Sequence, residues 1–217
     1  MSILSENQKR LITVLSGEKS LCDNFYLTGG TALAEFYLEH RLSEDLDFFS
    51  ETEFEVEAIS VLLRQIQKTA GVKSFRYEQS FNRNLFFLEL ENDTVKTEFT
   101  YFPFPRIEKK KKIGNLYVDS LIDIAVNKIF TIYQNPRSRD FIDLYFILKK
   151  EKWKIVDLVT KAKIKFDHHI DYLQLGAQLM KVSELKDYPK MIIKINDQDW
   201  QSFFIDEAMK FSQEVLE

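Results

Sequence analysis

Hydrophobic and polar positions in the first third of the chain alternate between helical and strand spacing. Apolar residues three and four apart predict an amphipathic helix over residues 5–16, and a short apolar run predicts a buried strand over residues 25–27. Helical spacing returns over residues 31–40, and strict alternation over residues 45–49 predicts a second strand. A longer helix is expected over residues 54–70. The chain therefore opens as helix, strand, glycine turn, helix, strand and helix.

Two further strand-like runs follow in the middle of the chain. They cover residues 84–91 and 94–102 and are separated by Asn92 and Asp93, a pair suited to a tight turn. Two prolines after residue 102 end the second run, because proline cannot extend a hydrogen-bonded ladder. We expect the two runs to be antiparallel neighbours.

The pattern becomes mostly helical from about residue 119. A helix is expected there, Asn135–Pro136 interrupts it, and helical spacing resumes over residues 139–148 and beyond. The pattern predicts an α/β (α+β) fold with residues 1–118 as an α/β core and residues 119–217 as a helical C-terminal lobe.

Composition narrows the class of protein. The chain is 45% hydrophobic and 14% aromatic, which is too apolar for disorder, and the apolar residues are too dispersed for a membrane span. The polar N-terminus does not resemble a signal peptide, and Cys22 is the single cysteine. These features predict a cytoplasmic protein without disulfides and without a membrane partner.

The formal net charge of −4 provides no general attraction for nucleic acid, but one basic run stands out. Lys109–Lys112 follow Arg106 closely. A charge run of this kind is usually a solvated loop, which is the interpretation we favour, and any contact with nucleic acid would have to be local.

Gly29 and Gly30 lie where the first strand meets the following helix. Bare backbone amides at such a junction can face an anion, so the pair is a candidate cradle for phosphate. An ordinary tight turn is the alternative, and the glycines alone do not decide between them.

Asp45 and Asp47 follow fifteen residues after the glycine pair. On a strand, residues two apart point to the same side, so both carboxylates are expected on one face. Two adjacent carboxylates repel each other, and a divalent cation removes that penalty. The alternative is an exposed edge strand, which the flanking Leu46, Phe48 and Phe49 argue against.

A third carboxylate on a neighbouring strand would supply a further metal ligand and could draw the proton from an attacking hydroxyl. Glu98 is the candidate, because it alternates with Phe99 on the strand that follows the predicted turn. Glu89 and Glu91 on the partner strand are rivals that spacing does not exclude.

The ordered motifs resemble the AbiEii/AbiGii-like nucleotidyltransferase family of the polymerase-β-type superfamily. The resemblance covers about residues 25–148 and rests on Gly29-Gly30-Thr31, on residues 41–48 (RLSEDLDF), on residues 123–128 and on residues 139–145 (RDFIDLY). It implies a nucleotidyltransferase-type mixed sheet flanked by helices. It also implies an NTP donor, two Mg²⁺ ions, transfer of NMP to an acceptor hydroxyl, and a toxin that has a separately encoded antitoxin.

The resemblance also implies roles for individual residues. Asp45, Asp47 and Glu98 would hold metal, and Lys128 and Asp143 would join them in catalysis, with Asp143 completing the site or orienting Lys128. The NTP-binding set would be Gly29, Gly30, Thr31, Arg41, Ser43 and Lys128. Glu98 departs from the family, where aspartate is common, and its longer side chain moves the carboxylate outward by about one methylene.

Alternatives remain open at this level. Lys128 has apolar neighbours in the sequence, which favours a functional position over a surface charge, whereas Arg139 and Asp140 are expected in structural ion pairs. A toxin with tRNA or protein as acceptor is the favoured function. The alternatives are a small-molecule (antibiotic-type) nucleotidyltransferase and an inactive nucleotidyltransferase fold that serves as a binding module.

Overall fold

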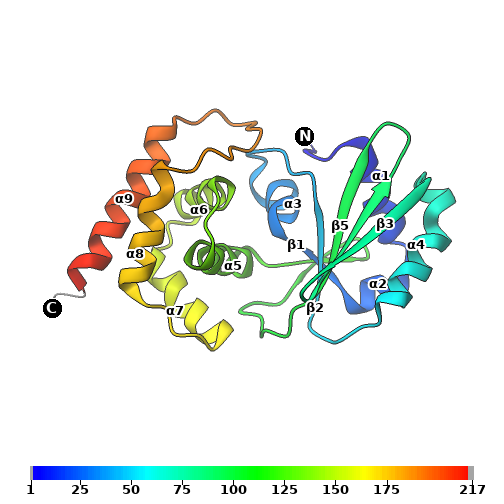
Figure 1. Ribbon diagram of the computed structural model, residues 1–217, viewed down its shortest axis with the longest axis horizontal. Coiled ribbons are helices and arrows are strands. Elements are labelled where there is room, and N and C mark those ends of the chain that lie inside the picture. The colour runs from blue at the N-terminus through cyan, green and yellow to red at the C-terminus, as the bar shows by residue number, and fades with distance from the viewer. Residues whose placement is uncertain (1, 215–217) are drawn as a thin grey trace. The chain divides into compact units, whose positions relative to one another are not determined.

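The computed structural model describes residues 2–214, which form two compact units that interleave along the chain (Figure 1). Unit 1 contains the residues up to Tyr37, then Leu42–Pro105 and Lys109–Ser120. Unit 2 contains Leu38–Arg41, Arg106–Glu108 and the chain from Leu121 onward. Two short segments from the first half of the sequence thus belong to the helical unit.

Within residues 2–214, seven strands form one mixed sheet in the order β3-β4-β5-β2-β1-β7-β6. The strands are β1 Tyr26–Thr28, β2 Leu46–Ser50, β3 Ser74–Ser80, β4 Arg83–Glu89, β5 Thr94–Tyr101, β6 Lys111–Ile113 and β7 Leu116–Val118. β2 runs parallel to β5 and β1 runs parallel to β7, whereas the other neighbours are antiparallel. The predicted hairpin is confirmed as β4–β5, and the mixed sheet is confirmed with it.

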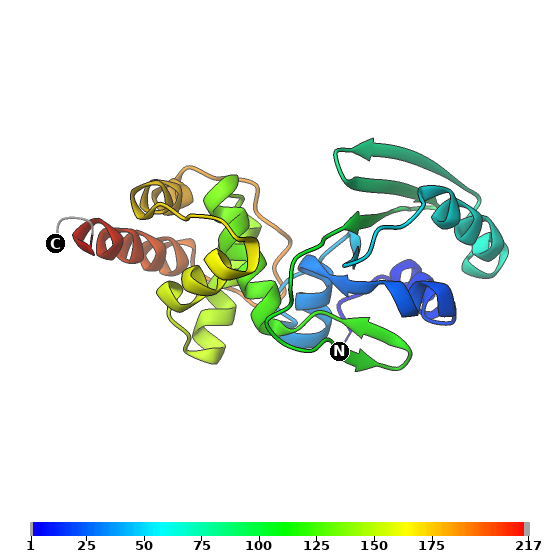
Figure 2. The same ribbon diagram turned by 90° about the horizontal axis from the view of Figure 1, so that it is seen from below.

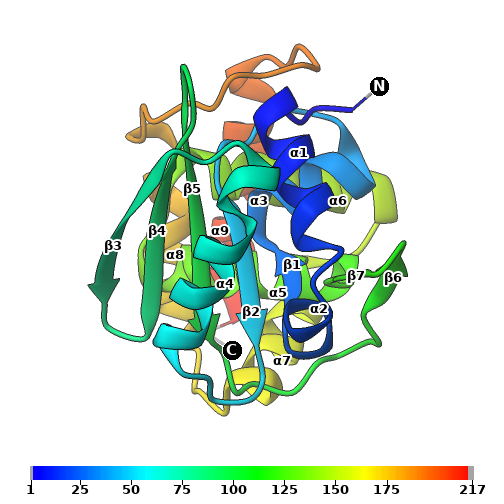
Figure 3. The same cartoon turned by 90° about the vertical axis from the view of Figure 1, so that its right-hand side faces the viewer.

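Apolar side chains on one face of this sheet form the core of unit 1. Phe48 and Phe99 stack with ring centroids 5.4 Å apart, and Phe86 meets Phe99 edge to face. Helices α1 (Glu6–Leu15) and α4 (Val56–Ala70) pack against each other and lie over the sheet in Figure 3. Both predicted helices are confirmed. The alternation along β2 and β5 therefore sends Phe48 and Phe99 into this core and places Asp47 and Glu98, together with Phe49, on the opposite face.

The segment between the first two strands differs in detail from the predicted helix over residues 31–40. A short helix, α2 (Lys19–Asn24), precedes β1, and β1 passes directly into α3 (Gly29–Leu33). A π-helical segment, η1 (Ala34–Leu38), continues α3, and Glu39 then adopts a left-handed φ of 52°. The helix therefore starts at the glycine pair itself rather than after it.

The part of unit 2 from Leu121 onward is mostly helical. Its elements are α5 Leu121–Gln134, α6 Ser138–Glu151, α7 Ile155–Phe166, α8 Tyr172–Met180, the 3₁₀ turn η2 Lys181–Ser183 and α9 Asp197–Glu214. Helix α5 packs against α6, α7 and α8, and α9 packs against α8 and α6 (Figure 1). Phe141 of α6 meets Phe204 of α9 edge to face within this core, with centroids 4.9 Å apart.

The solvated-loop interpretation of the lysine run is wrong for Lys111 and Lys112. They lie in β6, which pairs with β7 in the short green hairpin of Figure 2. Spacing missed β6 and β7 because each has three residues, and it missed β3 because that strand is mostly exposed and lacks apolar alternation. None of the helices within residues 2–214 combines the length and apolar character that crossing a bilayer requires.

Candidate active site

A polar row, Thr28, Asp47 and Glu98, crosses three neighbouring strands on the face of the sheet opposite Phe48 and Phe99. Thr28 of β1 is the register partner of Asp47 on β2, and Asp47 is the register partner of Glu98 on β5. Residues opposite each other on adjacent strands point to the same face, so the three side chains lie side by side. The structure thus brings together Asp47 and Glu98. Asp45 lies one residue before β2 rather than within the predicted strand.

The glycine turn packs directly on this row. Gly29 has a φ of +72°, and a Cβ at this position would overlap Oδ2 of Asp47 and lie 3.1 Å from its Cγ. The Thr31 side chain is fully buried, and its hydroxyl donates to the backbone carbonyl of Asp45. The glycine turn is therefore in contact with both aspartates. Gly29 leaves room for the Asp47 side chain, and Thr31 is hydrogen-bonded to the backbone of Asp45.

Two cations form ion pairs with the acidic row, which consists of Asp45, Asp47 and Glu98. Lys96 Nζ lies 2.7 Å from Oδ2 of Asp45, and Arg83 Nε donates to Oε1 of Glu98 at 2.8 Å. Arg83 also donates through Nη2 to Oε2, so the pair is bidentate. The hydrogen bond to Glu98 is the main cause that raises the pKa of Arg83, and the charges of Asp47 and Asp45 add to it. Arg83 therefore stays cationic beside all three carboxylates.

A buried carboxylate, Asp119, supports the strand that carries the glycine turn. It is 1% exposed and lies directly after β7. Its Oδ2 accepts a hydrogen bond of 2.8 Å from the Thr28 hydroxyl, and its backbone carbonyl accepts one of 2.7 Å from the Tyr37 hydroxyl. These bonds hold Thr28 at one end of the polar row. Spacing along the chain does not predict the contact of Asp119 with Thr28, because the two residues are 91 positions apart.

Unit 2 contains a separate buried charge network around Asp143. His40 Nε2 lies 2.7 Å from Oδ1, and Arg41 donates from Nε and Nη2 to the two carboxylate oxygens at 2.6 and 2.8 Å. Lys128 Nζ lies 2.7 Å from Oδ2 of Asp143 and 2.6 Å from Oδ1 of Asp140. Asp143 is thus ion-paired with Lys128.

The cations of this network keep both buried aspartates ionised. Burial opposes ionisation of Asp143, but Lys128, Arg41 and His40 together hold its pKa well below the ordinary value. Burial likewise opposes ionisation of Asp140, and Lys128 and Arg137 lower its pKa despite it. The structural ion pair expected for Asp140 is confirmed, although its arginine partner here is Arg137. Both carboxylates are therefore ionised at neutral pH.

The predicted site residues divide between the two units. Unit 1 contains Gly29, Gly30, Thr31, Ser43, Asp45, Asp47 and Glu98, and unit 2 contains Arg41, Lys128 and Asp143. Ser43 is tied to helix α1, because its backbone carbonyl accepts a hydrogen bond of 2.8 Å from Gln8. Sequence reasoning did not identify Arg83, Lys96, His40 or Asp119, whose partners lie between 15 and 103 residues away.

Comparison with known proteins supplies the identity. The sequence model of the nucleotidyl transferase AbiEii toxin family, described as a type IV toxin-antitoxin system, matches residues 13–212. The chain belongs to the AbiEii family. It is therefore a nucleotidyltransferase. An uncharacterized protein of Aquifex aeolicus (strain VF5) is 35% identical to this AbiEii-family enzyme over 154 residues, which is 70% of each chain.

Solved structures show the same fold. The crystal structure of JHP933 from Helicobacter pylori matches 97% of this AbiEii-family enzyme and 94% of its own chain, with a TM-score of 0.63 and 20% identity. MenT4, a nucleotidyltransferase toxin from Mycobacterium tuberculosis H37Rv, matches 94% of this chain and 80% of its own, with a TM-score of 0.54 and 14% identity. At these identities the likeness concerns the fold.

The acidic row of this AbiEii-family enzyme fits a divalent cation. Asp45 and Asp47 offer carboxylate oxygens, and the absent side chain of Gly29 leaves Asp47 close to bare backbone. Residues 2–214 contain no group of three or more His, Cys, Asp or Glu side chains that could hold a metal ion. Mg²⁺ commonly binds through one or two carboxylates, with phosphates and water supplying the rest.

Substitution of Gly29 by alanine is expected to lower both activity and stability of this AbiEii-family enzyme. The left-handed backbone costs an alanine about 1–2 kcal/mol, and the new Cβ displaces the Asp47 carboxylate. Denaturant unfolding and an NMP-transfer assay measure the two effects. Gly71→Ala is the matched control, because Gly71 has a φ of +73° but faces Arg10. The control should lose similar stability and keep its activity, and equal activity in both variants would contradict the assignment.

Proposed function

We propose that this enzyme uses Mg²⁺ to transfer an NMP group from an NTP to an acceptor hydroxyl, with the chemistry on the polar face of the unit 1 sheet. The observation that supports this best is the register of Asp47 with Glu98, with Gly29 packed against Asp47. Carboxylate oxygens next to bare backbone support this proposal, because a phosphate chain can approach glycine backbone closely and a metal ion can bridge it to the carboxylates.

Each part of the row has a proposed task. The backbone of Gly29 and Gly30 receives the triphosphate, and Asp45 and Asp47 bind the metal. Thr31 helps to position Asp45 for metal binding, because its hydroxyl donates to the backbone carbonyl of Asp45. Bound Mg²⁺ would neutralise phosphate oxygens and favour a deprotonated attacking hydroxyl. Lys96 then has to leave Asp45 or share it with the metal, because its ammonium lies 2.7 Å from Oδ2.

The proposed reaction is in-line attack of the acceptor hydroxyl oxygen on the α-phosphorus. A new phosphorus–oxygen bond forms, the bond from the α-phosphorus to the bridging oxygen breaks, and pyrophosphate leaves with the electron pair. Glu98 accepts the hydroxyl proton in this proposal. Arg83 and Thr100 hold its carboxylate in place, since Thr100 Oγ1 donates to Oε1 at 2.7 Å. Arg83 is thus a positioning residue for Glu98.

For the remaining predicted residues, the proposal follows the family resemblance. Arg41, Ser43 and Lys128 would contribute to NTP binding, and Asp143 would hold Lys128 and Arg41 in place. Membership in a type IV toxin-antitoxin family also supports a toxin role with a cognate antitoxin as partner. For the acceptor, tRNA and protein are the two macromolecular classes that the experiment below separates.

The decisive experiment incubates the purified chain with Mg²⁺, each of the NTPs radiolabelled at the α-phosphate, and total cellular RNA and protein. We expect label on a discrete band with wild type and none with the Asp45→Ala/Asp47→Ala variant, because the variant lacks both proposed metal ligands. Treatment of the band with ribonuclease or protease identifies the acceptor class. Omission of Mg²⁺ should abolish the label as well.

The matched control is Glu89→Ala/Glu91→Ala, which also removes two acidic side chains from unit 1 and tests the rival carboxylates. This control should label the band as wild type does. Equal labelling by the double aspartate variant would overturn the proposed site. Labelling of added small hydroxylated compounds in place of RNA and protein would assign the enzyme to the antibiotic-type class.

A further inference from the structure

The β6–β7 hairpin and the start of α2 form a basic surface within unit 1. Lys109–Lys112 lie in and just before β6, and Lys19 begins α2. Lys109, Lys111 and Lys112 are exposed. The acidic residues Asp23, which lines the same surface, and Glu18, which precedes Lys19, are fewer than these five lysines. Positive charge therefore dominates here, although the whole chain carries a formal net charge of −4.

Aromatic rings hold several of these ammonium groups. Lys110 Nζ lies 4.2 Å and Lys112 Nζ 5.7 Å from the centroid of the Tyr117 ring, and Lys111 Nζ lies 6.0 Å from that of Tyr37. A cation over an aromatic face is attracted by the ring but is not neutralised by it. The rings thus restrict the lysine side chains in advance without removing their charge, which lowers the entropy cost of binding an anion.

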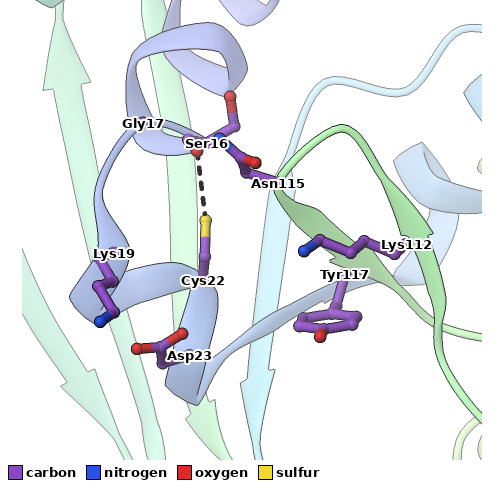
Figure 4. Close-up of a pocket in the computed structure, with 8 residues that line it drawn as sticks. All are labelled: Ser16, Gly17, Lys19, Cys22, Asp23, Lys112, Asn115 and Tyr117. Atoms are coloured by element: carbon purple, nitrogen blue, oxygen red, sulfur yellow. Dashed lines mark hydrogen bonds between the residues drawn. The ribbon is translucent and has the colours of Figure 1, made fainter.

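A hollow lies between the hairpin and α2. It measures about 280 Å³, and Figure 4 shows Lys112 and Tyr117 on one side of it with Lys19, Cys22 and Asp23 on the other. This volume is below the usual range of about 300–1,000 Å³ for ligand pockets, so it suits one phosphate or one base. Burial raises the pKa of the Cys22 thiol, which donates to the Ser16 carbonyl at 3.4 Å and stays neutral.

The hairpin also belongs to the same sheet as the proposed catalytic row. β7 pairs with β1, and β1 pairs with β2, so β6 lies three strand spacings from the strand of Asp47. Three spacings amount to about 14 Å. A chain of several nucleotides on the hairpin could therefore reach the acidic row of the same unit.

We propose that the β6–β7 hairpin, with Lys19, is a docking surface for the phosphate backbone of single-stranded RNA. The regularly repeated phosphates of a single strand match closely spaced lysines along an edge strand of the sheet. The further statement that this RNA presents the acceptor hydroxyl rests on the proposed function. The docking itself does not depend on catalysis and can be measured without NTP.

The test measures fluorescence anisotropy of a labelled oligouridylate of about 12 nucleotides with the full chain, across a salt series and without NTP. Lys111→Ala/Lys112→Ala should weaken binding about tenfold and reduce the slope of log K against log salt by about 1.4, because two phosphate contacts are lost. Tyr117→Leu should weaken binding about threefold through the loss of the ring. Lys68→Ala/Lys73→Ala is the matched control, since both lysines are exposed in unit 1.

Three results would overturn the docking surface. They are wild-type affinity in the hairpin variant with an unchanged circular dichroism spectrum, equal weakening in the control, and displacement of the RNA by polyglutamate at equal charge concentration. The transfer assay separates this proposal from the previous one. RNA binding that depends on the hairpin, without NMP transfer to any acceptor, would leave the docking surface standing and refute the proposed function. Equal transfer of NMP to RNA by wild type and hairpin variant would support the proposed function and refute the docking surface.

Discussion

Replacement of Asp47 by asparagine is expected to reduce kcat/KM for NMP transfer by about 10³-fold, equivalent to about 4 kcal/mol of transition-state stabilisation. The substitution keeps the shape of the side chain beside Gly29 but removes the charge that would bind Mg²⁺. Folding should be unaffected, because relief of repulsion from Asp45 and Glu98 offsets the lost attraction to Arg83. Steady-state kinetics with a saturating acceptor, together with a denaturant melt, test both statements.

Two further variants distinguish the proposed proton acceptor, Glu98, from its positioning residue, Arg83. Glu98→Gln should reduce kcat more than KM if Glu98 accepts the proton, whereas Arg83→Gln should alter the pH profile of kcat by releasing the Glu98 carboxylate. Glu89→Gln on β4 is the control and should remain within about twofold of wild type. Activity of Asp47→Asn within tenfold of wild type would show that the metal does not bind at this aspartate.

Replacement of Asp143 by asparagine is expected to lower the free energy of unfolding by about 3–5 kcal/mol. Asp143 is fully buried, and asparagine would leave Arg41 and Lys128 buried with too little negative charge around them. Both tryptophans, Trp153 and Trp200, belong to unit 2, so their fluorescence in a denaturant titration reports the unit that contains the network.

The difference in free energy of unfolding between wild type and Asp143→Asn should become smaller as the pH falls into the acidic range. The pKa of Asp143 is lower in the folded state than in the unfolded chain, so the carboxylate stabilises the folded state above about pH 4. That contribution falls as the pH drops below this value toward the folded pKa. Asp157→Asn, at an exposed position of α7, should change stability by less than about 0.5 kcal/mol. A difference that is constant from neutral to strongly acidic pH would contradict this account.

The strand alternation around Asp47 and Glu98 made the polar row predictable, because a period of two fixes which side chains share a face. It could not give the register that places these two residues opposite each other. Arg83 became a neighbour of Glu98 only through the pairing of β4 with β5, and no local pattern distinguishes it from other exposed arginines. Asp119 and His40 depend on contacts across 91 and 103 residues, which spacing along the chain does not encode.

The small elements escaped prediction for a different reason. β6 and β7 have three residues each, too few for a period to repeat, and the lysines of β6 have the composition of a loop. Pairing with β7 overrides that composition, since β7 is itself held by β1. The π-helical turn after α3 likewise has no signature in the apolar spacing that predicted a regular helix.

The interleaving of the two units has a consequence for how the chain matures on the ribosome. Leu38–Arg41 belongs to unit 2, but Asp143, the partner of His40 and Arg41, is synthesised about a hundred residues later. Unit 1 can begin to fold as it emerges, whereas this short segment must wait for helix α6. Chains that terminate early, at residue 120 for example, would therefore carry two cationic or ionisable side chains without their buried counter-charge. A nascent or truncated chain of this kind would lack a completed unit 2 until nearly all of its length had been made.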